Sequence, residues 1–416
     1  MPTGQPGKNV IVSHKVEAAF GTESATGAGA EAIRIHAGGG LTVGRGLIED
    51  PEVRRDGQRS MARLGMKEVT GGYAGTLSVG TWNTFLQYLF RRAWAATALK
   101  FTCDGFAAHT SLATTANTVT VAGTDTFTTI HGVKVGDVIR LGAMGATVDN
   151  INAVVSGIDA TEKIITVLGT PWGVVGADNN ATFTVMKKLK NAEGTIADPM
   201  VRYSTTVEEY FQDIDESELF SGCRVGSLKL TFEPGGVAKV EFGLVGANGR
   251  IVAAGAGAPW FTTPTEYTSI GLVAVDASIY LAGALITTVT GGELTIDIGL
   301  QGLPVVGGVA TPDVFEGAFK LTGSITAMRT LLTGSHLARF LAETDNVELS
   351  LLFVEPDAAV PVDFVHFFVP RLKYLGNSAN LGDEGALLET CPVYGAAKAT
   401  TTGYDAPCTM TVSTSA

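Results

Sequence analysis

Short runs of alternating apolar and polar residues recur over residues 31–80 and again after residue 225. A period of two places successive side chains on opposite faces of a strand, so these runs predict half-buried β-strands. The clearest pair flanks the turn Pro234-Gly235-Gly236 and predicts a β-hairpin with one apolar face. Its expected core residues are Leu228, Leu230, Phe232, Val240, Phe242 and Leu244, and its opposite face carries Lys229, Thr231, Glu233, Lys239 and Glu241.

One segment has the periodicity of a helix. Its apolar residues fall on one helical face, at Trp82, Phe85, Leu86, Leu89 and Phe90. Thr81 is the expected N-cap, and Arg91 and Arg92 suit the C-terminal end of the helix dipole. We interpret the stripe as core rather than as a cofactor-binding face.

Three short matches in the same order indicate an internal duplication. Residues 38–47 (GGGLTVGRGL) match 291–300 (GGELTIDIGL), 75–79 (GTLSV) match 323–327 (GSITA), and 225–231 (VGSLKLT) match 369–375 (VPRLKYL). The second member of the middle match is also followed by an expected amphipathic helix, with Leu337, Phe340 and Leu341 on one face and Ser335 as N-cap. Such a unit exposes sheet edges and requires neighbours, and two copies suit a ring in which each chain fills two positions.

These patterns predict a mainly β fold with one short helix per copy, arranged as a β-sandwich or as part of a barrel. Residues 101–189 are rich in Thr, Ala, Val and Gly in short strand-like runs, so we expect a small all-β domain inserted into the first copy. The expected division is an N-terminal arm at 1–30, the first copy at 31–100 and 190–262, the insert at 101–189, and the second copy with a C-terminal tail at 263–416.

Composition narrows the class of protein. The 416 residues include 29 Lys and Arg against 41 Asp and Glu, a net charge of −12, which argues against a basic grip on nucleic acid phosphates. Charged residues make up 17% of the chain, against about 25% in ordinary domains, which suggests that other subunits cover part of the surface. We expect no secretory signal and no membrane span, and we interpret residues 271–289 as β-structure.

Motif analysis predicts no catalytic, cofactor-binding or metal-binding residues. The chain has no GxSxG, P-loop, GxGxxG or HExxH pattern, its six histidines are scattered in sequence, and no two cysteines form a CxxC pair. Cys103, Cys223, Cys391 and Cys408 are therefore expected to be free thiols in a reducing compartment. The acidic stretch 208–218 fails the spacing of a calcium loop and is interpreted as a solvated or channel-facing surface.

A mixed-charge stretch at 49–63 admits two interpretations, a solvated loop or a loop that pairs with complementary charge on a neighbour. Its charged residues are Glu49, Asp50, Glu52, Arg54, Arg55, Asp56, Arg59 and Arg63.

Residues 48–94 (IEDPEVRRDG…YLFRRAW) and 207–246 (VEEYFQDIDE…VEFGLVG) resemble the tail tube proteins of long-tailed, non-contractile bacteriophages and prophages. The segment 133–141 (VKVGDVIRL) is similar to small β-modules that such proteins carry. The resemblance implies a non-enzymatic virion protein without a cofactor, which is assembled in the host cytoplasm and stacks as rings into a tail tube. It also implies that the charged loop reaches the next ring, and that an inner sheet lines a lumen through which double-stranded DNA passes without specific binding.

With two folds per chain, three chains would form a pseudo-sixfold ring, and six would be needed without the duplication. The implied partners are other copies of the chain, a tape-measure protein, a tail terminator and distal tail proteins. Candidate lumen-facing acids are Glu233, Glu241 and Asp297. The alternative hypothesis is a carbohydrate-binding or hydrolytic β-protein of the virion tip or cell surface, which would require an aromatic platform or a carboxylate pair.

Overall fold

The computed structural model describes residues 7–52, 54–106, 108–303, 305–329, 334–343, 347–355, 361–379, 386–398, 403–405 and 407–415. Within these ranges the chain is mainly antiparallel β-structure with two α-helices, which confirms the expected fold class. No helix among the described residues is both long enough and apolar enough to cross a membrane.

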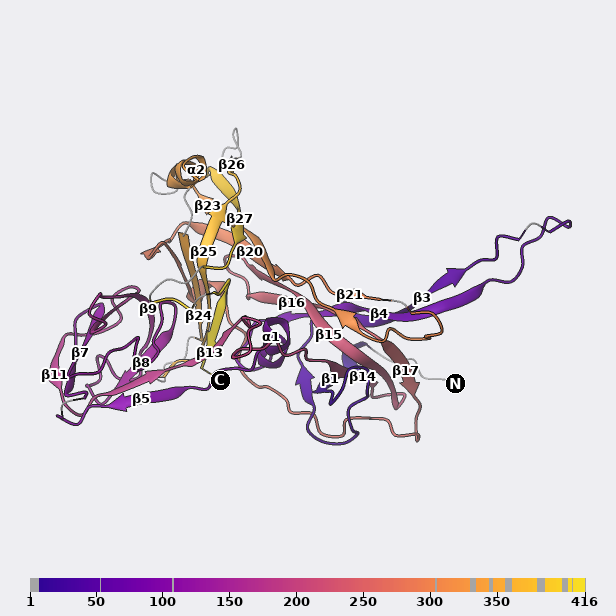
Figure 1. Cartoon of the computed structure of the whole chain (residues 1–416), viewed down its shortest axis with the longest axis horizontal. Helices are drawn as coiled ribbons and strands as arrows, with labels where there is room; N and C mark the ends of the chain where they lie inside the picture. The colour runs from indigo at the N-terminus through magenta and orange to yellow at the C-terminus, as the bar shows by residue number, and fades with distance from the viewer. Residues whose placement is uncertain are drawn as a thin grey trace.

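Eight antiparallel strands form one continuous sheet through the middle of the molecule, in the order β3–β4–β16–β15–β20–β23–β27–β25 (Figure 1). We call it the central sheet. Its strands are β3 (Gly40–Ile48), β4 (Arg63–Thr76), β16 (Lys239–Gly246), β15 (Glu216–Phe232), β20 (Val289–Asp297), β23 (Lys320–Met328), β27 (Leu388–Gly395) and β25 (Phe364–Tyr374).

The predicted hairpin lies at the centre of this sheet and is confirmed as β15–β16. Leu228 faces Phe242 and Leu230 faces Val240 across the pair, and all four side chains are buried. The alternating residues Lys229 and Glu241 are exposed on the other face. One face of the central sheet therefore covers the core, while the other is polar.

Two long strands, β15 and β25, continue beyond the central sheet and pair with different strands there. The first half of β15 pairs with β14 (Thr205–Phe211) and β17 (Asn248–Val252), and β14 pairs in turn with β1 (Val10–Val16), which pairs with β2 (Glu31–Ile33). The first half of β25 pairs with β24 (Val347–Val354) and β28 (Thr411–Thr414). β18 (Ala277–Leu281) pairs with β24 and with β19 (Ala284–Leu285), β13 (Lys187–Lys190) pairs with β28, and β26 (Ser378–Ala379) pairs with β27.

Helix α1 (Asn83–Phe90) packs against β15 and forms part of the main core. All five side chains of its predicted apolar stripe are buried. The predicted N-cap is wrong: α1 has no side-chain cap, and the Thr81 Oγ1 instead accepts a hydrogen bond of 2.8 Å from Ser78 Oγ. At the C-terminus, Arg91 adopts the left-handed conformation that ends the helix.

Helix α2 (Gly334–Leu341) lies beside β25 at one end of the molecule (Figure 1). The expected cap Ser335 lies outside the described side chains. Leu341 is 72% exposed, so part of the expected apolar face is open to solvent within the isolated chain.

Residues 98–185 form a separate eight-stranded sheet, seen at the left of Figure 1. We call it the side sheet; it has its own core, which includes Phe101, Phe127 and Phe183. A smaller cluster that contains Val138 and Phe364 joins it to β25. Its strands are β5 (Ala98–Thr102), β6 (Ser111–Thr114), β7 (Thr118–Ala122), β8 (Val138–Gly142), β9 (Asn152–Ile158), β10 (Ile164–Val167), β11 (Val175–Asp178) and β12 (Thr182–Val185).

A largely buried ion-pair triad also joins the side sheet to β13 and to residues 403–405. Lys188 Nζ lies 2.5 Å from Asp137 Oδ1 and 2.7 Å from Asp405 Oδ2. The two carboxylates raise the pKa of Lys188 against the effect of burial, so the lysine remains charged. The remaining elements are the 3₁₀ turns η1 (Gly7–Asn9) and η2 (Ala274–Asp276) and the short pair β21 (Gln301–Gly302) and β22 (Val314–Phe315).

Candidate functional site

The β3–β4 hairpin projects far from the rest of the molecule (Figure 1). We call residues 42–68 the hairpin arm. The predicted charged loop forms its tip, where Arg59 pairs with Glu49, and Arg54 lies 2.9 Å from Asp56. All eight charged residues of the loop are exposed, namely Glu49, Asp50, Glu52, Arg54, Arg55, Asp56, Arg59 and Arg63. The ion pairs are internal to the loop, and exposed pairs of this kind contribute little to stability.

The hairpin arm also carries large exposed apolar side chains that the sequence interpretation missed. The exposed fractions are 62% for Leu47, 60% for Ile48, 96% for Met61 and 58% for Leu64. Several apolar side chains on one isolated hairpin indicate a surface that a partner covers.

The base of the arm is fixed to the body by a carboxylate. Glu209 Oε1 accepts hydrogen bonds from the Tyr73 hydroxyl at 2.6 Å and from the Leu41 backbone N–H at 3.0 Å. Burial and the Glu209 carboxylate together raise the pKa of Tyr73 far above its ordinary value, so the phenol remains a donor. The arm therefore leaves the body from a rigid base.

The polar face of the central sheet carries two of the three candidate lumen acids. Glu241 lies opposite Lys229 on β15–β16, and Asp297 lies opposite Lys320 on β20–β23. Glu233 is exposed in the turn that follows β15. Lys229 Nζ also lies 3.0 Å from Glu293 Oε2, and this carboxylate raises the pKa of Lys229. The face thus alternates cations and anions rather than presenting an acidic surface alone.

A hollow of about 670 Å³ opens on this polar face. Backbone of Gly38–Gly40 and Gly71–Gly72 lines one side, and Lys229, Glu241 and Thr295 line the other. Glycine is needed at Gly72 for a steric reason, because a Cβ there would lie 2.4 Å from the Phe242 carbonyl oxygen. These glycines allow close approach of the strands at the root of the hairpin arm.

The outer strands of the central sheet, within the described part of the chain, are β3 and β25. β3 pairs with β4 alone among the described strands, and the last residues of β25 pair with β27. An unpaired strand edge is a ready surface for pairing with another chain.

The interpretation of the acidic stretch 208–218 as solvated or channel-facing is wrong for its first two residues. Glu208 is 1% exposed and accepts hydrogen bonds from the backbone N–H groups of Trp260 at 2.5 Å and Phe261 at 2.8 Å. Glu209 fixes the hairpin arm, as described above. Both carboxylates therefore hold segments of the fold together.

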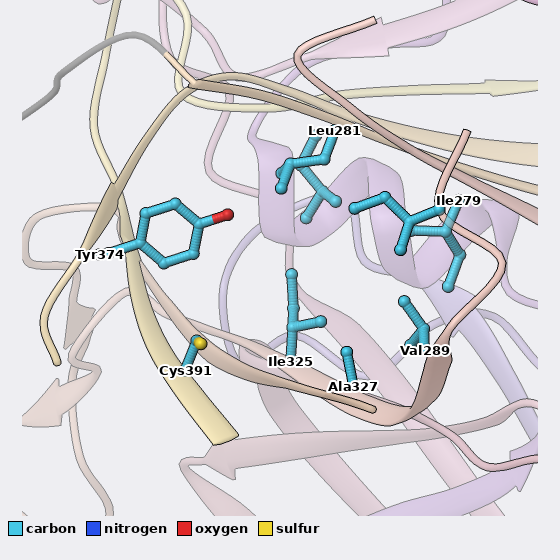
Figure 2. A pocket seen from close by; sticks show the side chains of 9 residues that line it. Ile279, Leu281, Val289, Ile325, Ala327, Tyr374 and Cys391 are labelled. Carbon is cyan, nitrogen blue, oxygen red and sulfur yellow. The ribbon is translucent and has the colours of Figure 1, made fainter. Parts of the chain in front are cut away.

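The apolar pocket in Figure 2 is too small to hold an organic cofactor. It lies between Ile279, Leu281, Ile325 and Tyr374 and has a volume of about 10 Å³, about the space of one water molecule. Burial raises the pKa of Cys391, which lines it, to about 11, so its thiol is protonated and inert at neutral pH. The pocket is a packing gap.

The tryptophans do not form an exposed platform for sugars. Trp82 and Trp172 are buried. Trp94 and Trp260 are partly buried, and their indole N–H groups donate 2.9 Å hydrogen bonds to the carbonyls of Asn83 and Ser24. Each is also covered by a cation, Lys187 on Trp94 and Arg250 on Trp260.

The exposed features are thus a projecting arm and the outer edge of β3, and both are surfaces that can pair with another chain. No curated protein matches the chain. The family described as phage tail tube protein matches residues 7–406. The protein therefore belongs to the phage tail tube protein family.

Proposed function

We propose that three copies of this chain close into a ring by pairing the end of β25 in one copy with β3 of the next. The outer edge of β3 carries this proposal, because β3 pairs with β4 alone among the described strands and closure would pair its other edge. Eight strands from each of three chains would form a barrel of 24 strands.

The two halves of the chain share one strand arrangement, which supports a ring of three chains. β3–β4–β16–β15 in the first half corresponds to β20–β23–β27–β25 in the second, each with a helix after its second strand. The first and third sequence matches fall on corresponding strands, β3 with β20 and β15 with β25. The middle match is four residues out of register, because Leu41 faces Gly71 whereas its counterpart Leu294 faces Gly323. We therefore retain the duplication, with the side sheet as an insert in the first copy.

The joint between the two halves supports the same mode of closure. Within the chain, the last part of β15 pairs with β20, the first strand of the second half. If the halves are equivalent, β25 would pair in the same way with β3 of the next copy. Three chains would then repeat one kind of joint six times around the ring.

The hairpin arm would reach the adjacent ring and stack rings into a tube. Its exposed apolar residues would be buried there, and the charged tip would select the partner surface by charge complementarity. The polar face of the central sheet, with Glu241 and Asp297 on its strands and Glu233 at its edge, would line the lumen. Carboxylates paired with lysines would let double-stranded DNA pass without being held.

The assembled tube would be a structural, non-enzymatic part of the virion tail, built in the host cytoplasm. A tape-measure protein, a tail terminator and distal tail proteins would be its partners. The side sheet would decorate the outer surface.

Deletion of residues 51–63 tests stacking, with a Gly-Ser segment of equal length as the matched control for loop closure. We expect both proteins to fold and to form rings, and neither to form tubes in negative-stain electron microscopy. Long tubes from either variant would contradict the role of the loop in stacking.

A further inference from the structure

Two histidines that are scattered in the sequence meet an aspartate at one place in the side sheet. His109 Nδ1 and His131 Nε2 each lie 3.2 Å from Asp125 Oδ2, and the three atoms lie within 4.8 Å of one another. His109 comes from the loop between β5 and β6, and the other two come from the segment between β7 and β8. The fold rather than the sequence spacing brings them together.

The backbone around the three side chains is held by hydrogen bonds. The Asp125 N–H donates to the Ala108 carbonyl at 2.9 Å, which ties the two loops together, and Lys163 Nζ donates to the Asp125 carbonyl oxygen. The Phe101 ring packs against both imidazoles, with centroid distances of 5.1 Å to His109 and 4.6 Å to His131. The donor atoms are thus preorganised by the fold.

One donor atom lacks a hydrogen bond. His131 Nε2 is buried and makes no hydrogen bond of acceptable geometry in the described part of the chain, although the Asp125 carboxylate is close. A buried polar atom without a partner is uncommon in folded proteins and requires an explanation. An ion between the imidazole and the carboxylate would supply the missing partner.

We propose that His109, Asp125 and His131 bind one zinc ion. Two imidazole nitrogens and one carboxylate oxygen are ligands that Zn²⁺ prefers, at about 2.0–2.2 Å. Tetrahedral ligands at those lengths lie about 3.3 Å apart, which is close to both nitrogen–oxygen separations. The two nitrogens lie within 4.8 Å of each other and would have to move closer together to reach the same spacing.

The cluster is also accessible. The side chains are 24% exposed for His109, 17% for Asp125 and 10% for His131, so the cluster lies near the surface, and a water molecule would complete a four-coordinate site. The ion would cross-link the loop after β5 to the segment after β7, so it would stabilise the side sheet.

The test uses the full chain, stripped of metal with a chelator and titrated with Zn²⁺ in a calorimeter. We expect one Zn²⁺ per chain with a Kd in the micromolar range or below, and a loss of at least tenfold in affinity in Asp125→Asn and in the double variant His109→Gln/His131→Gln. His36→Gln is the matched control, because His36 lies outside the cluster and bonds to Thr76. It should bind as the unaltered chain does.

Two readouts keep the test decisive. Co²⁺ added to the unaltered chain should give the strong visible absorption of a four-coordinate ion, and circular dichroism should show that the variants fold. If a variant does not fold, the Co²⁺ spectrum of the unaltered chain decides whether the chain binds a four-coordinate metal ion. Absence of Zn²⁺ binding and of that spectrum, or equal binding by the folded variants, would overturn the proposal and leave an ion-pair cluster without metal.

Discussion

Polar substitution of the hairpin arm should abolish tube formation without unfolding the chain. The variant replaces Leu47, Ile48, Met61 and Leu64 with serine. These side chains are 58–96% exposed, so the isolated chain gains little from them, and each substitution should change its free energy of unfolding by no more than about 0.5 kcal/mol.

The expected effect on assembly is far larger. Together the four side chains expose the equivalent of about three large apolar residues. Burying one such residue is worth about 1.5–3 kcal/mol, so full burial against the next ring would stabilise each chain in the tube by about 4–8 kcal/mol. Since about 1.4 kcal/mol is a factor of ten, the critical concentration for tube growth should rise by at least roughly 10³-fold.

Sedimentation of assembled protein across a concentration series measures this critical concentration, which is the threshold for tube growth. Urea unfolding of the soluble fraction measures the free energy of unfolding. Val174→Ser is the matched control, because Val174 is 79% exposed but lies far from the arm in sequence, just before β11 of the side sheet. It should leave the threshold unchanged. An unaltered threshold in the fourfold variant, with stability preserved, would refute the burial of the arm between rings.

Three further predictions concern the stability of the chain. Lys188→Met leaves the buried carboxylate of Asp137 and the partly buried one of Asp405 without their cation and should lower the free energy of unfolding by about 3–5 kcal/mol in urea titration, whereas a change below about 1 kcal/mol would contradict the triad. Burial lowers the pKa of His366 to about 3, below the ~6.5 of an unfolded histidine, so the chain should lose up to about 1.4 kcal/mol per pH unit below about pH 6.5 through this residue. His366→Gln should reduce that slope, and an identical slope would exclude His366 as its source. Gly75→Val places a Cβ 2.4 Å from the Arg34 carbonyl and 2.5 Å from the Trp82 ring, so its melting temperature should fall sharply; Gly46→Ala, which meets nothing within 4 Å, is the control.

The strands and the first helix were predictable because burial imposes a strict period on them. Leu228 and Phe242 alternate with exposed residues on two long strands, and the apolar stripe from Trp82 to Phe90 packs as expected. The N-cap prediction failed because Thr81 can bond either to the helix or to Ser78, and local pattern does not decide between them.

Of the candidate functional site, the sequence predicted only the exposed, charged tip of the hairpin arm, because that feature depends on neighbouring residues in the chain. The tip of the hairpin arm is exposed as the sequence indicates, but the buried roles of Glu208 and Glu209 depend on residues from distant segments, Trp260 and Tyr73. The meeting of His109 with His131 depends on the same kind of long-range contact. The ring count, the lumen-facing residues and the domain division remain predictions.

Electron microscopy of the purified chain across a concentration series tests the central claim most directly, with image averaging to count chains in each ring. The account predicts hollow, regularly banded tubes or single rings, each with three chains and pseudo-sixfold symmetry. Rings of six chains, or dispersed single chains at every concentration, would contradict it.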